Sequence, residues 1–339
     1  MTQTPAATDP ISSIRDAIRQ RQRFLLTSHA RPDGDSIGSQ LAMAFALDAL
    51  GKHVRIVNAD GAPDHYQDFP GMDRIQIAAS THTSDVDAVI VMECGDLART
   101  GVAGLEHPVV INIDHHLGNS LYGAINWFDE GAAACGEMVF DIIRALGVPL
   151  TLEIATHVYL AILTDTGSFH HSHITPRTFD ICRQTVEAGV NPAAMARRVF
   201  DSNSFGKLKL IGSLLDSMEL ADEGRLAILY LDDAVLAACG CTNNDTEGLI
   251  NLPLTAREIQ AVVFFKVSTD NAVRVSMRSK YDVDVRQVAN AFGGGGHKNA
   301  AGFTVRGQLE DVKGDILGRI VAAIADGIQS RPNLEPVNP

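Results

Sequence analysis

Apolar and polar positions follow two recurring patterns along the first 200 residues. Short apolar runs are typical of buried strands, and they occur at 24–27, 54–58, 88–92 and 109–113. Apolar residues at helical spacing predict helices near 12–21, 36–50, 134–146, 152–164 and 177–188. Strands that alternate with helices in this way are typical of a mainly parallel sheet flanked by helices. Residues 11–200 are therefore predicted to form an α/β domain.

A second region follows a predicted helical connector at residues 201–224. Beyond it, apolar runs predict strands at 226–231, 261–267 and 272–277, with helices near 244–252 and 283–292. The chain of 339 residues is too long for one small core, which favours two domains. We expect a smaller α/β domain at 225–328 and a disordered tail, rich in Pro and Asn, at 329–339.

Histidine and acidic residues follow three of the predicted strands. In a parallel sheet the carboxyl ends of the strands lie along one edge, where ligands bind. His29, Asp33 and Asp35 come after the first strand. The third strand is followed by Glu93 and Asp96, and the fourth by Asp114, His115 and His116. We therefore expect these side chains to meet at one edge of the sheet.

The residue types at this edge point to a metal ion. Imidazole nitrogens together with carboxylate oxygens suit Mn²⁺, Zn²⁺ or Fe²⁺ better than Ca²⁺. Asp165 ends a predicted helix, where the helix dipole disfavours an anion unless a positive partner such as a metal is present. The alternatives are an ordinary turn in which Asp35 or Ser36 caps the next helix, and a solvated Asp165.

Four consecutive glycines, Gly293 to Gly296, precede His297 and Lys298 in the second region. Such glycines let the backbone approach a ligand closely and point several N–H groups at an anion. The order of residues does not fit a P-loop. Arg278 ends a predicted strand upstream and is a candidate phosphate clamp. The alternatives are a flexible linker and a solvated strand end.

Charge and cysteine content narrow the class of protein. A formal net charge of −13 argues against a protein that coats long duplex DNA, but it allows a short anionic substrate held by metal ions. Five scattered cysteines without a C-x-x-C pair predict reduced thiols in a cytoplasmic protein. We find no signal-peptide pattern and no apolar stretch of membrane-spanning length.

With these motifs in hand, the chain resembles the DHH-family phosphoesterases. The resemblance is carried by His29-x-x-x-Asp33-x-Asp35, Glu93, Asp114-His115-His116 and Thr164-Asp165-Thr166-Gly167. The Gly-Gly-Gly-His stretch resembles the DHH-associated C-terminal substrate domain. Within the superfamily the chain is most similar to oligoribonucleases of the NrnA type. These degrade very short RNAs and dinucleotides, and often remove the 3′-phosphate from 3′-phosphoadenosine 5′-phosphate.

The resemblance implies an active site in the cleft between the two domains, with two divalent metal ions, Mn²⁺ in preference. His29 and Asp33 would hold one ion, and Glu93 would bridge to a second ion held by Asp35, His115 and Asp165. Asp114 would orient the side chains next to it, and His116 would face the substrate phosphate. Asp96 would lie behind the metal ligands and would not bind a metal ion itself. The implied substrate contacts are Arg99, Arg278, Gly294, Gly295, Gly296, His297 and Lys298.

Two departures from the family pattern stand out. Glu93 occupies a position where the family usually has Asp, which leaves open the metal preference and the spacing of the ions. His170 and His171 stand where relatives often carry Arg and Tyr, which leaves open what contacts the substrate there.

The predicted function is hydrolysis of short oligoribonucleotides and dinucleotides to mononucleotides, together with conversion of 3′-phosphoadenosine 5′-phosphate to AMP. One alternative is a phosphodiesterase acting on cyclic or linear dinucleotides in second-messenger turnover. Another, from a different class, is a nucleotide-binding regulator that has lost catalysis. The resemblance is also compatible with a homodimer.

Overall fold

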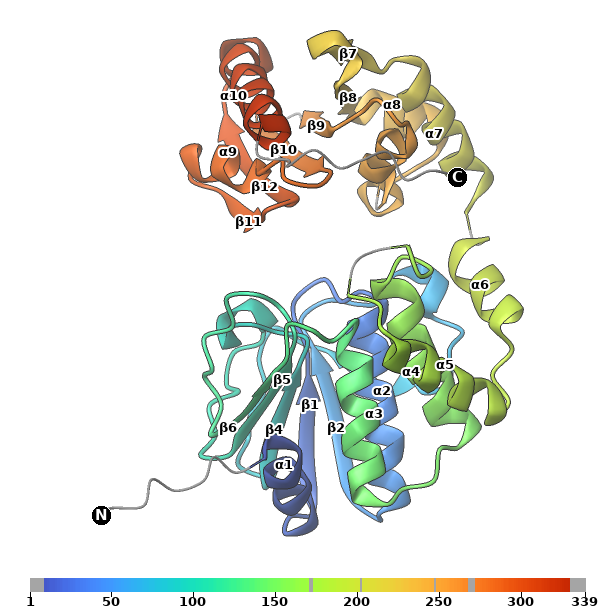
Figure 1. Cartoon of the computed structure of the whole chain (residues 1–339). Coiled ribbons are helices and arrows are strands. Elements are labelled where there is room, and N and C mark those ends of the chain that lie inside the picture. The colour runs from blue at the N-terminus through green and yellow to red at the C-terminus, as the bar shows by residue number, and fades with distance from the viewer. Residues whose placement is uncertain (1–8, 171–172, 202, 247, 268–271, 330–339) are drawn as a thin grey trace. The chain divides into compact units, whose positions relative to one another are not determined.

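The computed structural model describes residues 9–170, 173–201, 203–246, 248–267 and 272–329. It divides into two compact units, Met1–Ser202 and Asn203–Pro339 (Figure 1). The tail expected to be disordered lies outside the described residues, apart from position 329. In the part of the chain that is described, no helix is both long and apolar enough to cross a bilayer.

The first unit is built on a six-stranded sheet in which every neighbouring pair is parallel. In spatial order its strands are β3 (Ile75–Ile77), β2 (His53–Asn58), β1 (Arg23–Thr27), β4 (Ala88–Met92), β5 (Val110–Asp114) and β6 (Ile125–Phe128). The four predicted strands and the α/β class are confirmed. The two edge strands β3 and β6 were not predicted, because they are short, partly exposed and lack a clear apolar run.

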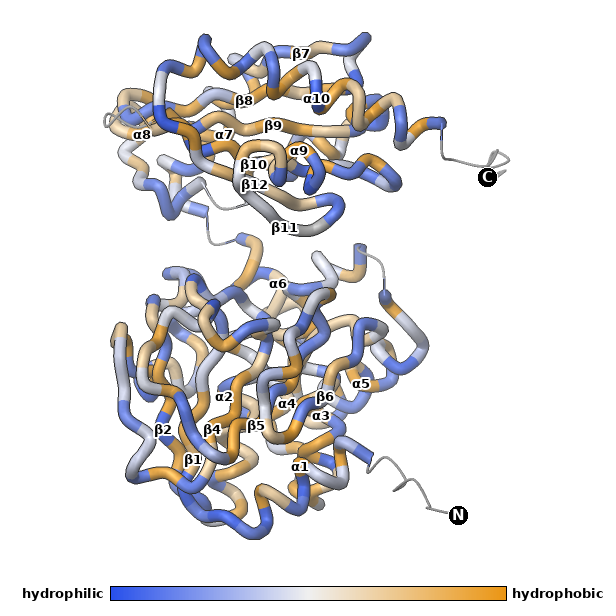
Figure 2. The backbone as a smooth tube through the Cα atoms, turned by 90° about the vertical axis from the view of Figure 1, so that its left-hand side faces the viewer, coloured by the Kyte–Doolittle hydropathy of each residue, from blue (hydrophilic) through white to orange (hydrophobic). Residues whose placement is uncertain are grey.

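Helices cover one face of this sheet. They are α1 (Pro10–Arg19), α2 (Gly34–Ala49), α3 (Cys135–Leu146) and α4 (Leu152–Asp165), followed by α5 (Pro176–Glu187) and α6 (Pro192–Phe200). The main core lies between this helical layer and the sheet (Figure 1). A smaller apolar cluster on the opposite face joins the strands to the segment that contains Val102 and Leu105. Hydrophobic residues run along β4 and β5 (Figure 2).

Helix α2 is buried on almost every side, because it packs against β1, β2 and β4 and also against α4. The crossing of α2 and α4 is unusually close. A Cβ atom added to Gly38 would lie 2.5 Å from the carbonyl oxygen of His157, and one added to Gly34 would lie 2.5 Å from the side chain of Thr164. Small residues at this crossing therefore bring the end of α4, which carries Asp165, close to the start of α2.

The second unit contains a six-stranded mixed sheet. In spatial order its strands are β11 (Gly295–His297), β12 (Ala300–Arg306), β10 (Ala272–Ser279), β9 (Ala261–Val267), β8 (Leu226–Asp232) and β7 (Glu219–Ala221). The pair β8–β9 is parallel and the other pairs are antiparallel. The apolar strand β9 lies within the sheet (Figure 2).

Helices pack on both faces of the second sheet. One core lies against α9 (Val285–Ala291) and α10 (Leu309–Gln329), and the other against α7 (Phe205–Asp216) and α8 (Asp233–Cys239). Helix α7 falls within the residues expected to connect the domains, and its Leu210 and Leu214 pack in the second unit. The helices α8 and α10 and the strands β7, β11 and β12 were not predicted.

The prediction of a helix near 244–252 is wrong. The chain there forms two 3₁₀ segments, Asn243–Thr246 and Leu249–Thr255. Gly248 precedes the second segment with φ +79°, a left-handed conformation that no α-helix contains. The other helix predicted in this domain, near 283–292, is confirmed as α9.

The close crossing of α2 and α4 generates the first prediction. The substitution Gly38→Ala should lower the free energy of unfolding of the first unit by about 1–3 kcal/mol, because the added methyl group meets backbone atoms of α4. Unfolding of this unit can be followed by the fluorescence of Trp127, the single tryptophan, which lies on β6.

The matched control is Gly318→Ala in α10, where an added Cβ has no neighbour within 4 Å. Circular dichroism should show that this change is neutral or stabilises by up to about 1 kcal/mol, because alanine is the better helix former. Equal stability of the Gly38→Ala variant and the wild type would contradict the interpretation of the crossing.

Candidate metal centre

The carboxylate of Asp35 binds the first turn of α3. Its oxygens accept hydrogen bonds from the backbone N–H groups of Cys135 (2.6 Å) and Gly136 (3.0 Å) and from the hydroxyl of Ser39 (2.8 Å). The residue at the N-cap of α3, Ala134, has no side chain that could take this role. A side chain from α2 therefore caps α3, and the positive end of the helix dipole stabilises the buried carboxylate.

Glu93 follows β4 and is fully buried. Its Oε1 lies 3.2 Å from Nε2 of His115 and 3.4 Å from Nε2 of His116. Its Oε2 is also buried, and no hydrogen-bond partner for it exists among the described residues. A buried carboxylate oxygen without a partner is costly, so this atom is a candidate ligand for a cation.

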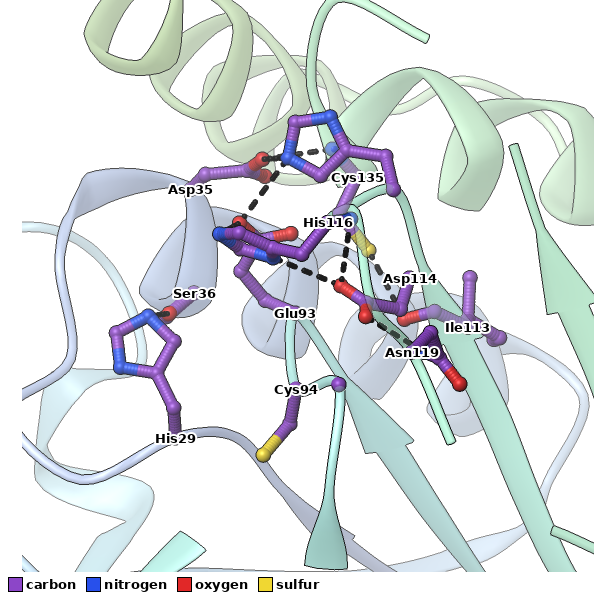
Figure 3. Close-up of polar contacts among 12 residues, drawn as sticks. His29, Asp35, Ser36, Glu93, Cys94, Ile113, Asp114, His116, Asn119 and Cys135 are labelled. Carbon is purple, nitrogen blue, oxygen red and sulfur yellow. Dashed lines mark hydrogen bonds and ion pairs between the residues drawn. The ribbon is translucent and has the colours of Figure 1, made fainter. Parts of the chain in front are cut away.

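Three histidines turn the same ring nitrogen toward the acids. In His115 and His29, Nδ1 lies 3.0 Å and 2.9 Å from the carbonyl oxygens of Ala132 and Ala30. In His116, Nδ1 lies 2.8 Å from Oδ1 of Asp114 (Figure 3). Because these oxygens act as acceptors, Nδ1 carries a hydrogen in each ring, and Nε2 is the nitrogen that would meet a ligand. Metal-binding histidines are commonly held in this way.

The side chains at the ends of different elements converge on one point. One oxygen or nitrogen from each of Asp35, Glu93, His115 and Asp165 lies within 4.8 Å of the others, and Glu93, His115 and His116 form an overlapping group. Nε2 of His115 lies 3.5 Å from Oδ2 of Asp165 and 3.9 Å from Oδ2 of Asp35. The edge of the sheet predicted from sequence is where these groups meet.

The charges of these groups are strongly coupled. Burial and the nearby charge of Asp35 raise the pKa of Glu93 well above its usual range, and they raise the pKa of Asp165 to about 7. Burial lowers the pKa of His115, but the surrounding carboxylates, Glu93 foremost, outweigh this effect and raise it to about 11. The carboxylates of this cluster thus outnumber the positive charges close to them.

This donor set fits a divalent metal ion. It combines hard carboxylate oxygens with imidazole nitrogens whose orientation is fixed by a second hydrogen bond, a combination that suits Mn²⁺, Zn²⁺ or Fe²⁺. A cation would give the free oxygen of Glu93 a partner and would neutralise the repulsion among the acids.

The structure also brings His29 and Asp33 together, with 3.6 Å between Nε2 and Oδ2. Asp33 is the N-cap of α2 and accepts a hydrogen bond from the backbone N–H of Ser36 (2.9 Å). The residue that caps this helix is therefore Asp33 rather than Asp35 or Ser36. The rings of His29 and His116 lie 6.5 Å apart, so the pair borders the cluster described above.

The remaining candidates of the first unit lie around the cluster. Asp96 caps the 3₁₀ segment Leu97–Thr100 through Ala98 (2.9 Å) and contributes no ligand atom to either group. Arg99 lies in that segment, and its carbonyl oxygen accepts a hydrogen bond from the backbone N–H of Ala30 (2.8 Å). His170 follows α4, whereas His171 lies outside the described residues.

In the second unit the glycine stretch has a packing role that the sequence did not reveal. A Cβ atom added to Gly294 would collide with Phe303 and the carbonyl oxygen of Gly302, and one added to Gly296 would lie 2.6 Å from Cα of Ala301. These glycines therefore let β11 approach β12. A Cβ atom added to Gly295 would have no neighbour within 4 Å. Lys298 forms an ion pair with Asp282 (2.7 Å), and the side chain of His297 is not among the described ones.

Sequence reasoning missed several polar groups that hold the site. Asn119 donates to Oδ2 of Asp114 (2.6 Å) (Figure 3), and Asn112 and Tyr122 bind the carbonyl oxygen of Cys94. Only Asn112 carried a signal, since it is a polar residue inside an otherwise apolar strand. The carbonyl oxygen of Ala132 could not have been found, because any residue supplies one.

The role of Asp35 as a helix cap generates a prediction that needs no metal. In metal-free protein, Asp35→Ala should be less stable than Asp35→Asn by about 1 kcal/mol, since both lack the charge but only asparagine keeps an acceptor for α3. Unfolding monitored by Trp127 fluorescence in the presence of a chelator measures the difference. Equal stability of the two variants would show that the cap contributes nothing.

Comparison with known proteins agrees with the motifs. The model of the DHH family, N-terminal domain, matches residues 23–162, and the DHHA1 domain model matches residues 230–326. The bifunctional oligoribonuclease and PAP phosphatase NrnA of Thermus thermophilus is 33% identical over 283 residues, which cover 83% of this chain and 84% of that protein.

Solved structures show the same fold. The crystal structure of an exopolyphosphatase-related protein from Bacteroides fragilis matches with a TM-score of 0.87 and 23% identity, covering 97% of this chain and all of that one. An exonuclease RecJ bound to manganese matches with a TM-score of 0.50 and 15% identity over 98% of both chains. The resemblance predicted from the motifs is thus confirmed, and the chain belongs to the DHH family, with a DHH N-terminal domain followed by a DHHA1 domain.

Proposed function

We propose that this protein is a metal-dependent phosphoesterase that hydrolyses short oligoribonucleotides and dinucleotides to mononucleotides, and 3′-phosphoadenosine 5′-phosphate to AMP. The observation that carries the proposal is the convergence of Asp35, Glu93, His115 and Asp165 within 4.8 Å of one another. The substrate class comes from the similarity to NrnA of Thermus thermophilus, whose name records both activities.

Two divalent metal ions would supply the electrophilic chemistry, because they neutralise a phosphodiester and lower the pKa of a bound water. Asp35, His115 and Asp165 would hold one ion, His29 and Asp33 the other, and Glu93 would serve both. Mn²⁺ is our choice of metal, supported by the donor set and by the manganese in the similar RecJ exonuclease.

The protein's own residues would orient the substrate and move a proton. Asn119 holds Asp114, and Asp114 fixes the Nδ1–H of His116. These two hydrogen bonds orient the ring of His116, so that its Nε2–H would donate a hydrogen bond to a phosphate oxygen or protonate a leaving oxygen. Asp114 would therefore act by orienting an imidazole rather than by contacting the substrate.

Arg278 is the strongest candidate for a substrate contact in the second unit. It lies on β10, burial lowers its pKa, and no carboxylate pairs with its guanidinium among the described residues. The group stays charged, since an arginine titrates far above neutral pH. A partly buried cation without a counter-ion suits a phosphate, so we propose Arg278 as a substrate contact of the second unit, together with Gly295, His297 and Lys298. Arg99 stays a candidate contact of the first unit.

Loss of His115 tests the proposed metal chemistry. The wild type should release mononucleotide from a diribonucleotide when Mn²⁺ is present and lose this activity with a chelator. His115→Ala should fold and lose roughly 100-fold or more of the activity, because a ligand is removed. The matched control is His82→Ala, which alters an exposed histidine of the same unit and should leave the rate unchanged.

A panel of substrates separates the proposal from its alternatives. Faster hydrolysis of a cyclic or linear dinucleotide second messenger than of a diribonucleotide would favour the second-messenger phosphodiesterase. Nucleotide binding without turnover of any substrate would favour the inactive regulator. Retained hydrolysis in folded His115→Ala would contradict the assignment of the metal centre.

The substitution Arg278→Ala tests whether Arg278 binds the nucleotide substrate. The variant should raise KM for a diribonucleotide by roughly 10–100-fold, as expected for a lost bond to a charged group, and leave bis-p-nitrophenyl phosphate little affected. The control is Arg274→Ala, an exposed arginine on the same strand. An equal loss on both substrates would show that Arg278 does not distinguish nucleotides.

Two further expectations stay predictions. The family resemblance is compatible with a homodimer, and the cysteine content with a cytoplasmic location. Size-exclusion chromatography with light scattering tests the first, and fractionation of cells tests the second.

A further inference from the structure

Glu93 adopts a backbone conformation that glutamate rarely takes. Its φ is +58°, in the left-handed region. A side chain with a Cβ atom is strained there, and the non-glycine residues that tolerate it best are Asn and Asp. The strain is notable because Glu93 belongs to both groups of candidate ligands in the metal centre. Such a conformation persists only where the surroundings hold it.

Hydrogen bonds from β5 and from Tyr122 fix the backbone on both sides of Glu93. Before the Cα atom, the N–H of Glu93 donates to the carbonyl oxygen of Ile113 (3.0 Å). After it, the carbonyl oxygen of Cys94 accepts two hydrogen bonds, from Nδ2 of Asn112 (3.1 Å) and from the hydroxyl of Tyr122 (2.9 Å). We call Asn112, Tyr122 and the carbonyl group of Cys94 the carbonyl clamp.

Burial explains why the clamp is strong. Asn112 is fully buried, and its Nδ2 also lies 2.9 Å from the hydroxyl oxygen of Tyr122. Burial raises the pKa of Tyr122, so its hydroxyl stays protonated and able to donate. A polar side chain in the middle of a buried strand is costly, and the two hydrogen bonds of Nδ2 compensate for part of the cost, since Oδ1 of Asn112 has no partner among the described residues.

The same segment of chain also holds the neighbouring parts of the centre. The backbone N–H of Ser120 donates to the carbonyl oxygen of Gly95 (2.8 Å), and Asn119 donates to Asp114. Residues 119–122 therefore tie the loop after β4 to the loop after β5. The clamp is part of this connection and is the part closest in sequence to Glu93.

We propose that Asn112 and Tyr122 are positioning residues for Glu93. By holding the carbonyl group of Cys94, they keep Glu93 in its left-handed conformation, which aims its carboxylate at the imidazoles of His115 and His116. This inference rests on the proposed metal site. It adds that the affinity of this site for metal depends on two residues that supply no ligand.

The test compares Mn²⁺ affinity of folded variants by calorimetric titration of metal-free protein. Tyr122→Phe and Asn112→Leu should each weaken Mn²⁺ binding by roughly 10–100-fold, the usual effect of removing a group that orients a metal ligand. The matched control is Tyr159→Phe, which removes the hydroxyl of a buried tyrosine in α4 of the same unit and should leave the affinity unchanged.

A double-mutant cycle shows whether the clamp acts through Glu93. In a Glu93→Gln background, Tyr122→Phe should cause no further loss of Mn²⁺ affinity, because the oriented ligand is already gone. Equal losses in both backgrounds would mean that Tyr122 acts only on general stability. Unchanged affinity of folded Tyr122→Phe, or an equal loss in Tyr159→Phe, would overturn the inference.

Hydrogen exchange of metal-free protein provides a readout that does not depend on metal. Amides of the segment 93–97 should exchange faster in Tyr122→Phe than in the wild type or in Tyr159→Phe, because the clamp restrains this backbone. Unchanged exchange would overturn the clamp. If the wild type binds no Mn²⁺, the proposed function fails, while faster exchange in the variant would still support the clamp itself.

Discussion

Several carboxylates lie within a few ångströms of one another at one edge of the first sheet, and the rest of the first unit is arranged around that constraint. Asp35 and Glu93 are buried and Asp165 is partly exposed, and the three carboxylates would repel one another at this short separation. Two sources of positive charge reduce the repulsion, namely the N-terminus of α3 at Asp35 and the imidazole of His115. They do not satisfy every oxygen, since Oε2 of Glu93 has no partner among the described groups. A metal ion is the simplest group that would complete the site.

The fold produces this convergence by two different routes. The parallel strands β1, β4 and β5 bring their carboxyl ends to one edge, which places the loops carrying Asp35, Glu93 and His115 side by side. Asp165 arrives instead from the end of a helix. Its position depends on the close crossing of α2 and α4 at Gly34 and Gly38, because larger residues would move α4 away.

The histidines show how a second hydrogen bond orients a ring toward a candidate metal site. Each ring turns Nε2 toward the acids because its Nδ1–H donates a hydrogen bond to a carbonyl or carboxylate oxygen. The orientation of each imidazole is therefore decided by the hydrogen bond of the ring nitrogen that faces away from the acids. The carbonyl clamp beside Glu93 extends this principle from the ring of a histidine to the backbone of a glutamate.

The residue order alone was sufficient to predict the α/β class, four strands of the first sheet and the edge at which the acids and histidines meet. These predictions succeeded because burial imposes a visible apolar pattern and because parallel strands align their ends. The edge strands β3 and β6 were not predicted, because partly exposed strands show little apolar patterning in the sequence. In the second domain, Gly248 broke a helix that apolar spacing had favoured.

Only tertiary structure decided what individual polar residues do. The capping of α3 by Asp35 joins positions 100 residues apart, and the clamp on Cys94 joins three separate segments. The close contact of Gly294 and Gly296 with β12 showed that glycines attributed to ligand binding also serve packing. Periodicity reports burial along one segment, whereas hydrogen bonds between distant segments depend on how the layers pack, and no local pattern encodes that packing.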